Sequence, residues 1–268
     1  MKHSLLILLI IMSISFNCSN QKDNNPSIKT EEVKYTSDGT TLIGFLAYDE
    51  NKEGVRPGII VVHEWWGNNN YSHKRAEMLA KLGYIALAID MYGNGKQADN
   101  PGDAGKFASE AMQNIDEAKA RFDAGVNFLK EQSQTDTNRI AAIGYCFGGG
   151  VVLKMALMGD NLEGAVSFHG TLPTDSVKDP GNVKAKFLVC GGAEDPFVPK
   201  EVVDKFRKAM DDANTDYKFI SYPGAVHAFT NPAADSLGKK FNIPIAYNKE
   251  ADEKSWIAMQ QFFEEIFK

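Results

Sequence analysis

The stretch that decides the fold is Gly144-Tyr145-Cys146-Phe147-Gly148, in which a cysteine lies between two glycines. It follows a predicted strand over residues 139–143 and precedes a helical run that ends at Met158. A sharp turn between strand and helix requires glycines, because side chains there would clash with neighbouring backbone. The helix N-terminus directs N–H groups at the cysteine, which stabilises a thiolate and developing oxyanion charge. The stretch therefore predicts a nucleophilic cysteine, and the alternative is a glycine-rich loop around a buried structural cysteine.

Apolar strands alternate with helices on both sides of this motif. Uninterrupted apolar runs predict strands over residues 58–62, 84–89, 139–143, 164–168, 186–190 and 216–221. Helical spacing predicts helices over 72–82, 200–212 and 249–267, and one long or two short helices over 103–130. Residues 33–35 and 41–47 predict a hairpin around a turn at residues 37–39. This order is typical of one α/β domain whose mostly parallel sheet is covered by helices on both faces.

The first 30 residues predict an export signal rather than part of the fold. Lys2 and His3 precede an apolar run over residues 5–12 that is too short to span a membrane, as in a secretory signal peptide. Residues 1–18 resemble a bacterial lipoprotein signal in which Cys18 becomes lipidated, and the alternative is a cleaved signal with an incidental cysteine. Residues 19–30 are polar and predict a flexible tether. We expect an exported envelope protein whose only membrane contact is this anchor, with one domain over residues 31–268.

Charge and cysteine usage exclude several classes of protein. The 268 residues carry a formal net charge of -6 with both signs scattered, and no basic block predicts a nucleic acid partner. The cysteines are Cys18, Cys146 and Cys190, an odd and small set that does not suit a disulfide framework. Neither Cys-x-x-Cys nor His-x-x-x-His spacing occurs, so we expect no metal site. Cys190 lies inside a predicted strand and is expected in the core.

A thiol nucleophile needs a base, and the base needs an acid that orients it. α/β-Hydrolases carry these groups in the order nucleophile, acid, histidine, on loops at the carboxyl ends of strands. Asp195 follows the predicted strand at 186–190, and His227 follows the strand at 216–221. Glu194 competes with Asp195 for the role of the acid. His169 follows another strand and is expected either to line the site or to pack as a hydrogen-bonded core histidine.

The stretch His63-Glu64-Trp65-Trp66-Gly67 follows the first buried strand. Burying a lone carboxylate is costly, so Glu64 directly after an apolar run indicates a functional role. The residue after this strand in α/β-hydrolases gives the second oxyanion donor, and Trp65 is the candidate by position. Trp66 is expected either to contact substrate or to pack beneath the site.

Five motifs resemble the dienelactone hydrolase family of α/β-hydrolases, in the family's order, over residues 30–268. They cover residues 63–67, Asp90-Met91-Tyr92-Gly93, residues 144–149, residues 191–195 and His227-Ala228-Phe229. The resemblance implies a compact α/β-hydrolase fold without a large lid domain, with Cys146, Asp195 and His227 as the catalytic triad. It also implies that Glu64 contacts the resting thiol and helps to generate the thiolate, and that Trp65 and Phe147 give the oxyanion N–H groups. The residues in or beside these motifs that we expect to contact substrate are Trp66, Tyr92, Asn94, Tyr145 and Phe229.

The resemblance is weaker where it concerns the substrate. The founding dienelactone hydrolases hold a substrate carboxylate with two arginines, one after the Asp-x-Tyr motif and one after the catalytic histidine. The corresponding stretches here, residues 92–96 and 227–231, contain no arginine. Asn94 and Asn231 cannot neutralise a carboxylate, and Lys96 is not a bidentate substitute. We therefore expect a neutral ester, lactone or acyl compound as the substrate.

These residues predict a cysteine-dependent hydrolase of carboxylic ester or lactone bonds that works through an acyl-thioester intermediate and needs no cofactor. One alternative keeps the triad but makes the reaction thioester cleavage or acyl transfer. Another is a non-catalytic surface lipoprotein that binds a ligand. The expected partner is a small-molecule substrate, and the expected oligomeric state is a monomer.

Overall fold

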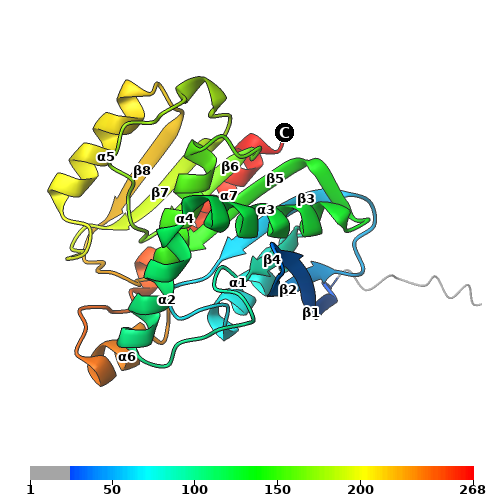
Figure 1. Cartoon of the computed structure of the whole chain (residues 1–268), viewed down its shortest axis with the longest axis horizontal. Helices are drawn as coiled ribbons and strands as arrows, with labels where there is room; N and C mark the ends of the chain where they lie inside the picture. Colours follow the sequence, from blue (N-terminus) through cyan, green and yellow to red (C-terminus); the bar gives the residue numbers. More distant parts are fainter. Residues whose placement is uncertain (1–24) are drawn as a thin grey trace, which may run out of the picture.

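The computed structural model describes residues 25–268, which form one eight-stranded sheet with helices on both faces (Figure 1). The strands are β1 (Ile28–Ser37), β2 (Thr40–Asp49), β3 (Arg56–Val62), β4 (Ile85–Ile89), β5 (Thr135–Tyr145), β6 (Gly164–Phe168), β7 (Lys186–Gly192) and β8 (Tyr217–Tyr222). Their order across the sheet is β1-β2-β4-β3-β5-β6-β7-β8. Strands β1 and β2 run antiparallel to their neighbours, and all other pairs are parallel. This confirms the predicted α/β-hydrolase sheet.

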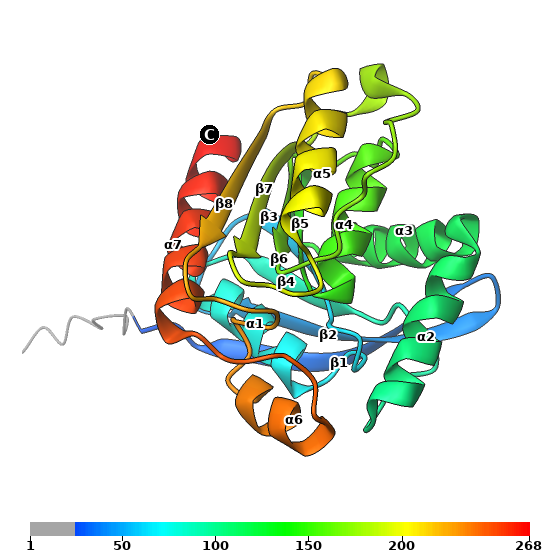
Figure 2. The ribbon, with the colours of Figure 1, turned by 90° about the vertical axis from the view of Figure 1, so that its left-hand side faces the viewer.

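The helices divide between the two faces of the sheet. They are α1 (Asn70–Lys81), α2 (Pro101–Gln113), α3 (Ile115–Glu131), α4 (Phe147–Leu157), α5 (Lys200–Asp212), α6 (Ala234–Phe241) and α7 (Lys249–Ile266). Helices α3, α4 and α5 pack on one face, and α1 and α7 pack on the other (Figure 1). The carboxyl ends of the parallel strands point toward α2 and α6 (Figure 2), so the loops that carry chemistry meet at that edge. No large lid domain is present in the part of the chain from residue 25 to residue 268.

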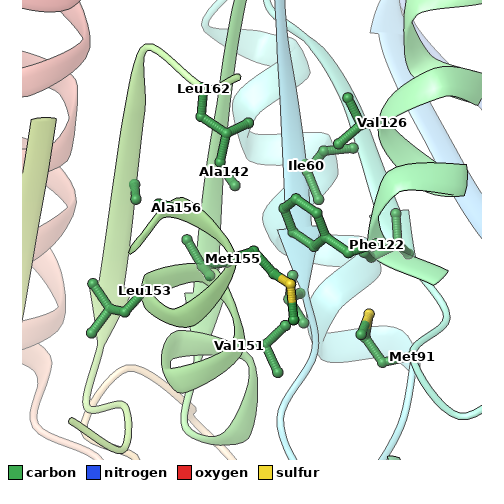
Figure 3. Close-up of a cluster of buried hydrophobic side chains, with 14 of the residues drawn as sticks. Ile60, Met91, Phe122, Val126, Ala142, Val151, Leu153, Met155, Ala156 and Leu162 are labelled. Atoms are coloured by element: carbon green, nitrogen blue, oxygen red, sulfur yellow. The ribbon is translucent and has the colours of Figure 1, made fainter. Parts of the chain in front are cut away.

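Two cores form because successive side chains of a strand point to opposite faces. In β3, Ile60 and Val62 join the core under α3, α4 and α5, whereas Ile59 and Val61 join the core under α1 and α7. The same alternation in β5 places Ala142 on the first side. Figure 3 shows the first core, in which side chains of α4 meet those of β3, β5 and α3. Burial on both faces explains why these strands are uniformly apolar in sequence.

The observed elements follow the predicted ones closely. The hairpin turns at Asp38 and Gly39, whose φ angles of 46° and 79° suit a tight two-residue connection between twisted strands. The segment at 103–130 forms two helices, because Asn114 leaves the helical conformation and caps α3 by accepting from Asp116 and Glu117 N–H groups. Helix α6 was not predicted from the sequence.

The N-terminal predictions fall mostly outside the described residues. The signal over residues 1–18, the lipidation of Cys18 and the tether up to residue 24 lie there. Strand β1 already begins at Ile28, so the last three residues assigned to the tether belong to the sheet. From residue 25 onward, no helix combines the length and the apolar character that crossing a membrane requires.

Candidate active site

Cys146 sits at the sharp turn between β5 and α4, in a strained backbone conformation with φ 53° and ψ -116°. The two flanking glycines make this turn sterically feasible. A Cβ on Gly144 would lie 2.1 Å from the carbonyl oxygen of Gly148, and a Cβ on Gly148 would lie 2.3 Å from that of Val62. Strain of this kind persists where surrounding structure enforces it, and it is common at catalytic nucleophiles.

Three side chains from separate loops form a continuous hydrogen-bonded chain. Nε2 of His227 lies 3.0 Å from Sγ of Cys146, and Nδ1 of His227 lies 2.8 Å from Oδ2 of Asp195. The other carboxylate oxygen of Asp195 accepts from the Phe197 N–H at 2.8 Å, which fixes the carboxylate. Glu194 is exposed and accepts from the N–H of Gly224, so Asp195 is the acid that faces the histidine.

The electrostatics of His227 reflect its place between the sulfur of Cys146 and the carboxylate of Asp195. Burial disfavours its charged form, but the sulfur of Cys146 and the carboxylate of Asp195 outweigh burial and raise the pKa of His227 to about 10. An imidazolium is therefore favoured opposite the sulfur, which is the proton arrangement of an activated thiol–imidazole pair.

Two backbone N–H groups in the loops around Cys146 are available to a ligand. Neither the N–H of Trp65 nor that of Phe147 has a hydrogen-bond acceptor within residues 25–268. Phe147 is the first residue of α4, where an N–H has no partner within the helix. The N–H of Gly148 donates to the carbonyl of His63 at 3.1 Å and holds the two loops together. Tyr92 adds a 3.0 Å hydrogen bond from its hydroxyl to the carbonyl of Trp65, which fixes the Trp65 loop.

Glu64 is buried at 3% exposure and accepts a 2.6 Å hydrogen bond from Nδ2 of Asn231. Burial raises the pKa of Glu64 to about 7, although the Asn231 hydrogen bond opposes this shift. The family resemblance implied a contact between Glu64 and the resting thiol. In this structure the sulfur instead meets His227, and the carboxylate instead meets Asn231. A carboxylate with a pKa near neutrality beside a triad remains well suited to a proton-linked role.

Two of the expected substrate contacts are wrong. Tyr145 and Phe229 have no exposed surface, because Tyr145 stacks on Phe168 at 4.8 Å and Phe229 packs against His169. Both lie in motifs that contain candidate catalytic residues, but their own side chains point into the core. Substrate could reach them only by displacing other core side chains.

The other three residues that we expected to contact substrate lie in three different environments. Tyr92 is 4% exposed and supports the Trp65 loop through its hydroxyl. Trp66 is 6% exposed and stacks on Phe241 of α6. Asn94 is exposed, has φ 57° and donates its N–H to the carbonyl of Thr41 in the hairpin, which places it at a turn. A direct substrate contact by these three residues stays a prediction.

A buried polar network behind the triad was missed by the sequence reasoning. Oγ1 of Thr230 lies 2.6 Å from Nε2 of His169 and 2.6 Å from the hydroxyl of Tyr71. The ring of His169 lies edge-on to that of His227, with 5.3 Å between the centroids. Arg75 donates to the carbonyl of Thr230 and ties this network to Asp252. The network supports the His227 loop from behind, and the polar Thr230 directly after a His-Ala-Phe sequence was the signal that could have indicated it.

We next consider whether side chains within residues 25–268 could bind a metal ion. Within residues 25–268, no group of three or more His, Cys, Asp and Glu side chains is placed to hold a metal ion. Cys146 and Cys190 are both free thiols, and Cys190 is buried in β7.

Comparison with known proteins identifies the family. The dienelactone hydrolase family model matches residues 43–267. Protein usf of Aquifex pyrophilus is 32% identical over 231 residues, covering 81% of this chain and 97% of its own. A protein of Aquifex aeolicus (strain VF5) named "Putative carboxymethylenebutenolidase" is 27% identical over 241 residues, covering 88% of this chain and 98% of its own.

A solved structure agrees with these sequence matches. The crystal structure of a dienelactone hydrolase-like promiscuous phosphotriesterase from metagenomic libraries superposes with a TM-score of 0.84. It has 35% sequence identity and covers 89% of this chain and 98% of the other. The chain belongs to the dienelactone hydrolase family, and it is a hydrolase of the class that acts on ester or lactone bonds.

Proposed function

We propose that this protein hydrolyses neutral carboxylic esters or lactones with Cys146 as a covalent nucleophile. The observation that carries the proposal is the continuous contact from Asp195 through His227 to the sulfur, at 2.8 Å and 3.0 Å. The raised pKa of His227 favours a proton on the imidazole that faces the sulfur. A protonated imidazole in this place is the partner that a cysteine nucleophile needs to attack a carbonyl carbon.

The reaction then proceeds in two half-reactions. The thiolate attacks the carbonyl carbon, and the oxyanion that forms accepts hydrogen bonds from the N–H groups of Trp65 and Phe147. The tetrahedral intermediate collapses to an acyl-thioester, and the leaving alkoxide takes the proton from His227. Water then gives a proton to the neutral His227 as it attacks the thioester, and collapse releases the acid and the Cys146 thiolate.

The environment of Glu64 favours a neutral substrate. Asn231 stands where the founding enzymes of the family carry an arginine, and its amide donates to Glu64. The pair contributes no positive charge with which to hold a substrate carboxylate. We propose that Glu64 assists proton movement during acylation, because its pKa of about 7 lets it exchange a proton near neutral pH.

Hydrolysis of p-nitrophenyl butanoate by wild type, Cys146→Ala and Cys190→Ala tests the proposal. We expect turnover in wild type, loss of about 1,000-fold or more in Cys146→Ala, and wild-type turnover in Cys190→Ala, since Cys190 is a buried core thiol. Equal turnover in wild type and Cys146→Ala would refute the proposed nucleophile. Added alcohols or thiols as acceptors separate hydrolysis from acyl transfer, because a transferase forms new esters or thioesters at the expense of the free acid.

For the N-terminal segment, we propose export and lipidation at Cys18, with the domain as a monomer held at the bacterial envelope. The support is the charged start, the short apolar run and the polar residues after Cys18. Metabolic labelling with a fatty acid should mark the wild-type protein but not Cys18→Ala. Equal labelling of both would contradict lipidation, and light scattering of the solubilised protein tests the monomer.

A further inference from the structure

A pocket of about 650 Å³ lies beside α4, and its lining includes Phe147, the residue that follows Cys146. Along α4 the lining continues through Val151, Lys154 and Met158. These positions recur at helical spacing on one side of the helix, so the pocket is a groove that follows α4 from its first turn to its end. At 1.5 Å per residue, the distance from Phe147 to Met158 is about 16 Å, so an extended chain of ten carbons, about 11 Å long, fits within the groove.

The walls of the groove come from two other parts of the fold. Met112 and Ile115, at the junction of α2 and α3, form one wall, and Leu172 and Pro173, in the segment after β6, form the other. Figure 2 shows the α2–α3 junction beside α4. The charged residues of the lining include Asp175, Lys178 and Asp179, all of which are exposed. Apart from these and the half-buried Lys154 of α4, the side chains named above are apolar, and a mostly apolar lining with a few polar groups is the usual character of a site for an apolar ligand.

Phe147 connects this groove to the catalytic centre. Its N–H is one of the two free donors in the loops around Cys146, and its side chain borders the groove. The ring is held in place by His63, with centroids 5.7 Å apart, and by Tyr92, with centroids 5.4 Å apart. The lining includes Phe147 but not Cys146, so an acyl chain that starts at the Phe147 N–H would enter the groove past the Phe147 side chain.

We infer that the groove along α4 binds the alkyl chain of the substrate's acyl group, so that the enzyme prefers esters of medium-chain acids of about ten carbons. This inference rests on the proposed function. The acyl group is the part of the substrate that stays on Cys146 through both half-reactions, whereas the alcohol leaves after the first. The group held beside Phe147 throughout the reaction is therefore the acyl chain, and burial of each methylene improves the transition-state complex by up to roughly fourfold.

The test compares kcat/KM for p-nitrophenyl acetate, butanoate and decanoate in wild type and in variants that fill the groove. Ile115→Trp narrows one wall, and Met158→Trp fills the far end at a position that is already 37% exposed, so folding tolerates the change. Ile257→Trp, at a 52% exposed site on α7, is the matched control. We expect wild type to favour decanoate over acetate by about tenfold or more. Ile115→Trp and Met158→Trp should lower that ratio about tenfold, and Ile257→Trp should leave it unchanged.

The possible outcomes distinguish failure of the groove inference from failure of the proposed function. If both groove variants leave the decanoate-to-acetate ratio of kcat/KM unchanged, the inference about the groove is overturned, even if the enzyme hydrolyses the acetate ester well. A wild type that prefers decyl acetate to methyl decanoate would overturn the assignment of the chain to the acyl side. If wild type hydrolyses none of these esters, the proposed function fails, and calorimetry with decanoate tests the groove directly. Binding of decanoate that is weakened about tenfold in Ile115→Trp would then support the groove, and equal or absent binding would overturn it.

Discussion

The side-chain amide of Asn231 donates a 2.6 Å hydrogen bond to Oε2 of Glu64, and both residues are buried. The pair joins the loop after β3 to the loop that carries His227, across 167 residues of sequence. Because the partner is an amide and not a cation, it stabilises the carboxylate less than burial disfavours it. The result is a carboxyl group with a pKa of about 7 next to the triad.

This raised pKa makes stability depend on pH. Below the ordinary pKa of 4.5, Glu64 is protonated in both the folded and the unfolded chain, so its titration does not lower the stability of the folded chain. Between pH 4.5 and about 7, the unfolded chain releases this proton and the folded chain keeps it, so the free energy of unfolding falls as pH rises. Above about pH 7 the free energy of unfolding has fallen by its full amount, about 3 kcal/mol. In urea unfolding, the free energy of unfolding of Glu64→Gln should therefore rise relative to that of wild type from pH 4.5 to pH 8. Parallel pH profiles of the two free energies would contradict the raised pKa.

The same substitution tests the role of Glu64 in the reaction. Glu64→Gln keeps the shape of the side chain and loses its ability to exchange a proton. We expect acylation, measured as the burst of p-nitrophenol in stopped flow, to slow by about tenfold or more while the protein stays folded. Glu194→Gln, at an exposed neighbour of the triad acid, is the control. A wild-type burst rate in Glu64→Gln would remove Glu64 from the mechanism.

Asp195 and Glu194 form a matched pair for the acid role, because only Asp195 faces Nδ1 of His227. Asp195→Asn should lower kcat by about 1,000-fold or more, since the amide favours the wrong tautomer of the histidine. Glu194→Gln should stay near wild type. Steady-state kinetics on one ester compares them, and a larger loss in Glu194→Gln would reverse the assignment.

Thr230 supports the triad from behind through its hydroxyl, which lies within hydrogen-bond distance of both His169 and Tyr71. Thr230→Val keeps the volume and leaves the buried His169 and the partly buried Tyr71 without this partner. We expect the free energy of unfolding to fall by about 1–3 kcal/mol in urea titration. Thr30→Val on the exposed part of β1 should change it by less than about 0.5 kcal/mol. Equal effects of the two substitutions would show that the hydroxyl has no structural partner.

Much of the fold follows from local sequence rules. Runs such as 58–62 and 164–168 are apolar because both faces of the strand are covered, and so they predict β3 and β6 directly. Helix α6 escapes these rules because its eight residues include Gly238. A Cβ there would lie 2.6 Å from the carbonyl oxygen of Ile245, so the reason for the glycine is a tertiary contact.

The site shows the same limit. The meeting of Cys146, His227 and Asp195 could be predicted because each follows a strand in a fixed order along the chain, and their catalytic role stays a proposal. Tyr145 and Phe229 were misassigned because residues close in sequence to Cys146 and His227 were assumed to face the site with them, whereas their side chains pack into the core against Phe168 and His169. The pairing of Glu64 with Asn231 could not be predicted, since it depends on how two distant loops meet.

The most direct test of the central claim is to identify the residue that carries the acyl group during turnover. Acid quenching of the reaction with p-nitrophenyl butanoate, followed by peptide mass mapping, locates that group. The account predicts one butanoyl group on the peptide that contains Cys146, labile to neutral hydroxylamine as a thioester, present in Cys190→Ala and absent in Cys146→Ala. A butanoyl group on any other residue, or undiminished turnover in Cys146→Ala, would contradict it.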